Sequence, residues 1–211
     1  MRTRITFTAS VSIILLLLMS GCCKTKKTYY PQGNLESEIR YCRQQTQGKA
    51  IWYYENGNKR LEAFYIKGLL EGEMKRYHSN GHIESIYQYA MGILEDTSFT
   101  YNQDGKLIQK CTYKNGVKNG PFYYYYPDGQ EQVKGFYVDD QYEGLWQYFD
   151  EEGFLVGEGQ FSKGAGMLKR YNAEGKTIQS RTYEKSSPTG KEIHYDREGN
   201  IIRSFSTVSI E

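Results

Sequence analysis

Aromatic residues recur along this chain of 211 residues at a constant interval, with turn-forming residues between them. One set stands four residues before a glycine: Tyr29, Tyr53, Tyr77, Tyr101, Tyr125, Phe149, Tyr171 and Tyr195. A second set stands eight residues after: Tyr41, Tyr65, Tyr89, Tyr113, Tyr137, Phe161 and Tyr183. Short aromatic stretches bounded by glycine predict β-strands. After residue 21, no stretch longer than 14 residues lacks a glycine, and none keeps a 3.6-residue period, which argues against helix.

The glycines between these stretches are themselves periodic. Gly33, Gly57, Gly81, Gly105, Gly129 and Gly153 are 24 residues apart, Gly175 follows after 22, and Gly199 after 24. Asn56-Gly57 and Asp104-Gly105 are dipeptides that tolerate the positive φ of tight hairpins. A second turn, such as Lys67-Gly68 or Met91-Gly92, follows in each repeat. Two turns predict two strands per repeat, and the period predicts about eight tandem β-hairpins.

The single irregular spacing tests this interpretation. Where other repeats contain a segment such as Gly68-Leu69-Leu70-Glu71-Gly72, one contains Gly164-Ala165-Gly166, which is two residues shorter. The aromatic positions on either side are intact. We expect the deletion to lie in a loop, because loops tolerate a change of length better than strand ladders do.

The composition favours exposed β structure. The chain has 21 tyrosines and 22 glycines, whereas leucine, isoleucine and valine are sparse. A tyrosine covers its cross-strand neighbours and still leaves its hydroxyl in water. Each ring that loses about 100 Å² contributes about 2.5 kcal/mol. Such contributions stabilise the fold only when they are summed along the array.

These repeats resemble the MORN-type repeat, in the bacterial variant that includes the YwqK-family antitoxins. The best copy is Tyr142-Glu143-Gly144-Leu145-Trp146, and Asn119-Gly120-Pro121-Phe122 is a weaker one. Asp96 and Asp140 replace expected glycines, and Thr207 replaces the last aromatic. The resemblance covers residues 29 to about 205. It implies an all-β fold, an elongated single-layer antiparallel sheet of about sixteen strands and about 80 Å in length, so we assign residues 29–211 to the array.

The N-terminus has the features of a secretory signal. Arg2 and Arg4 precede the apolar run Val11–Met19, which is too short to span a bilayer. Met19-Ser20-Gly21-Cys22 resembles the lipobox of bacterial lipoproteins, which implies lipid attachment at Cys22. We therefore expect a signal peptide at 1–21, an anchor and short linker at 22–28, and a lipid-anchored protein of the cell envelope. The outer membrane is favoured if the host has two membranes.

The charge balance and the cysteine content bear on which ligands and which covalent links are expected. Removing residues 1–21 removes two arginines and no acid, so 25 basic and 25 acidic residues remain. A neutral chain is a poor candidate for binding nucleic acid. Cys23, Cys42 and Cys111 form no regular set, which argues against a disulfide framework. One bridge after export stays open, including one between Cys42 and Cys111.

Candidate chemistry is sparse. His78 and His82 lie in one turn with no evident third ligand, so we predict no metal site. Acidic runs such as Asp150-Glu151-Glu152 fall at turns, where solvent satisfies them, and no nucleophile elbow is present. We predict no catalytic residues, no cofactor and no enzyme activity.

A surplus of aromatic residues is the remaining signal. The run from Pro121 to Tyr126 places aromatics on both faces of a strand. The candidate residues for binding a partner are Trp52, Tyr54, Phe122, Tyr124, Tyr126, Trp146 and Tyr148. They either form a docking stripe for a protein or a glycan, or they cover neighbouring strands. We predict an envelope-anchored interaction or scaffold module. The alternatives are an antitoxin or immunity protein and, without electrostatic support, direct binding of lipid by the repeats.

Overall fold

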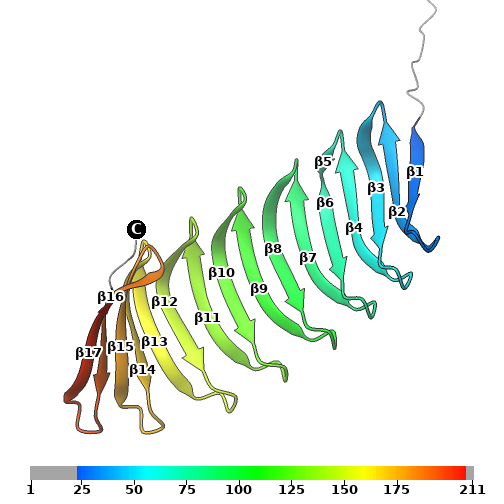
Figure 1. The fold of residues 1–211 in the computed structure, drawn as a ribbon. Coiled ribbons are helices and arrows are strands. Elements are labelled where there is room, and N and C mark those ends of the chain that lie inside the picture. The colour runs from blue at the N-terminus through cyan, green and yellow to red at the C-terminus, as the bar shows by residue number, and fades with distance from the viewer. Residues whose placement is uncertain (1–22, 208–211) are drawn as a thin grey trace, which may run out of the picture.

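The computed structural model describes residues 23–207, and these form one open antiparallel sheet of 17 strands (Figure 1). The first nine are β1 (Lys24–Tyr29), β2 (Leu35–Cys42), β3 (Gln45–Tyr53), β4 (Lys59–Ile66), β5 (Leu69–Leu70), β6 (Gly72–Tyr77), β7 (Ile83–Ala90), β8 (Ile93–Tyr101) and β9 (Leu107–Lys114). The others are β10 (Val117–Tyr125), β11 (Glu131–Val138), β12 (Gln141–Phe149), β13 (Leu155–Ser162), β14 (Ala165–Tyr171), β15 (Thr177–Glu184), β16 (Ser187–Tyr195) and β17 (Ile201–Thr207).

Apart from the short strand β5, each strand pairs with its neighbours in chain order, so the sheet is a simple meander. β5 and β6 both pair with β4 and together occupy one position in the sheet. Figure 1 shows a single layer of curved strands, with β1 and β17 at opposite ends. The described residues contain no helix long and apolar enough to cross a membrane. The predicted fold class, an elongated single-layer sheet of tandem hairpins, is confirmed.

The sheet begins earlier than the sequence predicted. Residues 24–28, expected to be part of a linker, belong to strand β1 and pair with β2. Thr28 and Ser37 share a hydrogen bond of 2.7 Å between their hydroxyls, and Lys27 pairs with Glu38. Lys27 and Thr28 therefore face residues of β2 that complement them. The predicted signal peptide and Cys22 lie outside the described residues.

The disulfide that the sequence left open joins Cys23 to Cys42. It links the residue before β1 to the end of β2 and so closes the first hairpin covalently. Cys111 is a free, buried cysteine in β9. A bridge between Cys42 and Cys111 is thereby ruled out.

The two kinds of turn occupy opposite edges of the sheet and differ in geometry. At the Asn-Gly turns, only the glycine has positive φ, as at Gly57 (86°), and Asn56 instead accepts a hydrogen bond from the Asn58 amide. The two-residue turns are the others: Lys67 and Gly68 both have positive φ, 50° and 83°. The tight hairpins therefore lie at the second turn of each repeat, and the Asn-Gly turns are wider loops closed by an αL glycine.

Side chains at both edges of the sheet bond to the next repeat. Tyr54 Oη donates to the Tyr77 carbonyl and Asn56 Nδ2 donates to the Ser79 carbonyl, each at 2.7 Å. At the other edge, the Lys67 amide donates to Gln47 Oε1 at 2.8 Å. The loops therefore continue the nearest-neighbour coupling of the strands.

The shorter repeat loses residues from a bulge, not from the turn. In the hairpin β9–β10, Lys118 faces Tyr113 but Phe122 faces Cys111, so two extra residues bulge out of β10. The hairpin β13–β14 keeps its Lys163-Gly164 turn and pairs without any shift in register. The expected loop position of the deletion is thus wrong in detail. The ladder is preserved because the missing residues never took part in pairing.

Candidate interaction surface

The two faces of the sheet differ in burial and charge. Cross-strand partners share a face, so the register places Ala50, Ala63, Cys111 and Trp146 on one face, which we call the packed face. All four are buried. The opposite, charged face carries lysines and glutamates in ion pairs: Lys27–Glu38, Lys49–Glu62, Lys59–Glu62, Lys75–Glu73 and Lys134–Glu131.

The packed face holds an aromatic cluster over β10–β15. Its buried members are Tyr137, Trp146 and Phe161, and its partly buried members are Phe122, Val133, Tyr142, Tyr148, Leu168 and Tyr183. The Trp146 ring stacks on Phe122 at 5.6 Å between centroids and lies 4.2 Å from the ring of Tyr142. Glycines make room for these rings: a Cβ on Gly135 would overlap Trp146, and one on Gly159 would overlap Phe161.

This cluster contains three of the residues predicted to bind a partner. Trp146 is only 2% exposed, and its Nε1 donates to the Phe136 carbonyl at 3.2 Å. Phe122 and Tyr148 pack beside it. Trp146 therefore covers neighbouring strands, as the alternative interpretation held, because in a single layer only a large side chain can seal the backbone around a glycine. Tyr124, on the same face, is 36% exposed.

The other predicted residues lie elsewhere. Tyr126 occupies a turn, where its hydroxyl donates to the Phe149 carbonyl at 3.0 Å, and Tyr54 occupies the corresponding turn of an earlier repeat. Trp52 lies on the packed face far from the cluster, in a hollow of about 440 Å³ with Arg60, Leu61, Tyr65 and Arg76. The structure thus brings together Phe122, Trp146 and Tyr148 in the cluster. Tyr126 lies near Tyr148, but Trp52 and Tyr54 do not.

A groove opens on the packed face beside the cluster. One part, of about 310 Å³, is lined by Tyr126, Val133, Tyr148, Leu168 and Arg170, among others. The adjoining part, of about 230 Å³, is lined by Leu168, Arg170, Gln179, Arg181 and Tyr183. Leu168 and Arg170 border both parts, so we treat them as one feature, the arginine groove. It combines aromatic walls with two guanidinium groups.

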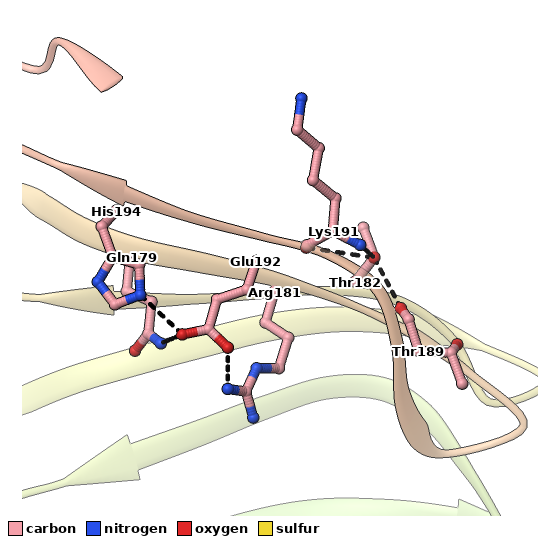
Figure 2. A network of polar contacts seen from close by, with 7 residues as sticks. All are labelled: Gln179, Arg181, Thr182, Thr189, Lys191, Glu192 and His194. Carbon is pink, nitrogen blue, oxygen red and sulfur yellow. Dashed lines mark hydrogen bonds and ion pairs between the residues drawn. The ribbon is translucent and has the colours of Figure 1, made fainter. Parts of the chain in front are cut away.

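Beside this groove, a polar network fixes Arg181 (Figure 2). Glu192 accepts a hydrogen bond from Arg181 and another from Gln179, and His194 Nε2 lies 2.7 Å from Glu192 Oε1. The hydrogen bond from Arg181 lowers the pKa of the Glu192 carboxyl, and those from His194 and Gln179 add to this effect. Glu192 therefore stays ionised and holds Arg181 in place.

The repeat alignment contained a signal for this network that residue-by-residue reasoning missed. Arg181 faces Glu192 across the strands. The corresponding pairs in three earlier repeats are Cys111 with Phe122, Gly135 with Trp146, and Gly159 with Leu168. In those repeats a small residue faces a large apolar one, whereas here an arginine faces a glutamate. Charged residues at a position that is apolar in the other repeats indicate a role other than packing.

The described part of the chain contains no evident metal-binding cluster. Residues 23–207 contain no group of three or more His, Cys, Asp or Glu side chains that could hold a metal ion. The two histidines of one turn each contact the next repeat: His78 Nε2 lies 3.0 Å from the Tyr101 carbonyl oxygen, and His82 Nδ1 lies 2.8 Å from that of Gln103. They occupy the positions of Tyr54 and Asn58 and take over their roles.

A one-layer meander of hairpins coupled through strands and turns is the architecture of a repeat protein, a class that typically presents an extended surface for binding. The comparison with known families identifies which one. The family profile described as the MORN repeat variant matches residues 24–43, 46–67, 70–90, 97–115 and 118–139. The chain belongs to the MORN-type repeat proteins. No curated protein matches it.

Proposed function

We propose that this protein is a lipid-anchored, non-enzymatic module of the bacterial envelope that binds a partner protein through its packed face. The all-β repeat fold is typical of proteins that act by binding. The observation that carries the proposal is the arginine groove, because it is an open feature that combines aromatic and charged side chains. Such mixed surfaces are typical of sites that recognise other proteins.

Two observations support the envelope location. The sequence Met19-Ser20-Gly21-Cys22 resembles a lipobox. The Cys23–Cys42 disulfide also fits export. Disulfides form in oxidising compartments, which exported proteins enter, and are rare in the reducing cytosol. Lipid on Cys22 would leave the sheet within two residues of the membrane surface, because β1 begins at Lys24.

Anchoring is tested by replacing Cys22 with Ser and following fatty-acid incorporation and partition into detergent. The variant should lose both, since acyl chains supply the membrane affinity. A Cys22→Ser protein that still incorporates fatty acid would exclude this residue as the attachment site.

Use of the packed face is tested with a photo-crosslinking residue at Tyr124 in the native envelope. Tyr124 is exposed on the packed face, and Lys110, on the charged face of the neighbouring strand β9, gives the matched control position. A defined protein adduct from position 124 and none from position 110 is the expected result. Equal labelling from both positions would contradict a specific surface.

The antitoxin or immunity alternative rests on the family resemblance alone and makes a different prediction. Loss of an immunity protein would be lethal in cells that carry the cognate toxin and harmless in cells that lack it. Deletion of the gene in both backgrounds separates this function from a scaffold.

A further inference from the structure

The arginine groove has an unusual charge environment for a protein whose mature chain is formally neutral. On the charged face, several lysines pair with neighbouring glutamates, as in Lys49–Glu62 and Lys75–Glu73. On the packed face, Arg170 is exposed and forms no ion pair with any other residue in the described range 23–207. A positive charge in an aromatic groove that the protein does not neutralise attracts an anionic ligand.

The second guanidinium in the groove is held in position. Arg181 is bound to Glu192 through one nitrogen, Nη2, yet its side chain is 39% exposed. A guanidinium has five N–H donors, so donors remain for a ligand. Because Glu192 and its partners already restrict Arg181, a ligand bound there loses less conformational entropy than one that must order a free arginine.

The register sets the spacing of the two arginines. Leu168 faces Arg181 and Arg170 faces Gln179, so Arg170 and Arg181 are diagonal neighbours on adjacent strands. Diagonal neighbours in an antiparallel pair are about 7–8 Å apart. In an extended peptide, residues i and i+2 lie on one side and are about 6.8 Å apart. Two acidic side chains separated by one residue therefore fit the two guanidiniums.

The apolar lining between the charges favours a peptide over a free anion. Leu168 lies opposite Arg181 and beside Arg170, and Tyr148 and Tyr183 also line the groove. An extended peptide can place apolar side chains against these groups and carboxylates against the arginines, whereas phosphate or a uronic acid would leave the apolar walls uncovered. The hollow around Trp52 also places two arginines, Arg60 and Arg76, beside Leu61 and Tyr65, but there Arg76 pairs with Glu84.

We propose that the arginine groove binds an acidic, extended segment of the partner protein, with carboxylates two residues apart contacting Arg170 and Arg181. This inference rests on the proposed function and specifies the chemistry of the partner. Arginine suits the task because its planar guanidinium binds a carboxylate through two parallel hydrogen bonds.

The test uses the complete disulfide-bonded chain and a fluorescent seven-residue peptide in which glutamate alternates with leucine. Binding is followed by fluorescence polarisation, with the same peptide carrying glutamine for glutamate as the ligand control. Arg170→Glu should weaken binding at least tenfold, and raised salt should weaken it in the wild type. Lys169→Glu is the matched variant, because it makes the same charge change one residue away on the opposite face; it should bind as the wild type does.

Several outcomes would overturn the inference: equal affinity for the glutamine peptide, equal loss in Lys169→Glu, or tighter binding of an oligoglucuronate or of inorganic phosphate than of the acidic peptide. Arg170→Leu keeps the result interpretable if Arg170→Glu folds poorly, since leucine suits the neighbouring apolar lining. Crosslinking from position 124 then separates the two proposals. An adduct that persists in Arg170→Glu would refute the acidic segment and leave the proposed function intact, whereas no adduct in the wild type would refute the proposed function itself.

Discussion

The ring of Trp146 lies directly on Gly135 of the neighbouring strand, and its indole nitrogen donates to the carbonyl of Phe136, the next residue. The ring occupies the space that any larger side chain at position 135 would need. This pair is the centre of the aromatic cluster, and it explains how a single layer of strands obtains a buried tryptophan without a second layer.

Gly135→Ala should therefore destabilise the protein by about 1–3 kcal/mol, the usual cost of overpacking. Chemical denaturation followed by tryptophan fluorescence measures this loss. The cost should shrink in a Trp146→Leu background, where the smaller side chain makes room for the added methyl group. An unchanged cost in that background would show that Trp146 is not what Gly135 accommodates.

Gly105→Val should cost about 1–3 kcal/mol, because Gly105 has a φ of 78° that a β-branched residue adopts only with strain. An added Cβ would meet only the His82 ring, at an ordinary 3.7 Å, so the cost comes from the backbone. Gly105→Asn is the control, since asparagine tolerates this conformation better. Equal losses for the two variants in thermal melts would argue against backbone strain as the cause.

Loss of the Cys23–Cys42 bridge should loosen the first hairpin before the rest of the array. The cysteines are 19 residues apart in sequence, and a loop of this length gives about 3 kcal/mol of stabilisation. Cys42→Ser should speed hydrogen exchange of β1 and β2 amides while leaving β8–β12 almost unchanged, because repeats couple to their neighbours. Reductant should reproduce the effect in the wild type and add nothing in the variant; an added effect there would implicate another group.

The protein should unfold at alkaline pH. Burial raises the pKa of Tyr65, Tyr89, Tyr137, Tyr142 and Tyr148 above the ordinary value. Since the unfolded chain ionises first, the stability these tyrosines contribute is complete below about pH 10 and declines as the pH rises from there towards the folded pKa. Absorbance of tyrosinate and circular dichroism should change together in a pH titration.

Tyr148→Phe provides the control for this effect, because it removes one ionisable group from the cluster and keeps the ring. The midpoint of alkaline unfolding should move to higher pH. A midpoint that stays in place, or tyrosinate that forms fully before the circular dichroism changes, would mean that the buried tyrosines do not drive the transition.

Local features of the fold could be predicted from the sequence because they depend on short-range preferences. The 24-residue period, the two turns per repeat and the positive φ at Gly57 and Gly68 all follow from backbone requirements that glycine meets at those sites. Even the interaction of Tyr54 with the next repeat is periodic, since Tyr30 and Tyr126 make the same hydrogen bond. A residue that makes the same contact with the next repeat recurs at the same position in the period, so it can be recognised in the sequence.

Only the tertiary structure decided which residues share a face and a site. Trp146 and Tyr124 look alike as surplus aromatics, yet one is sealed over Gly135 and the other is exposed, because register and the bulge in β10 determine what lies beneath each ring. Cys23 and Cys42 come together because β1 pairs with β2. Arg170 and Arg181 come together because the register of β14 and β15 makes them diagonal neighbours. A periodic sequence specifies the strand and its turns; the contacts of a side chain depend on which residue the neighbouring strand places opposite it.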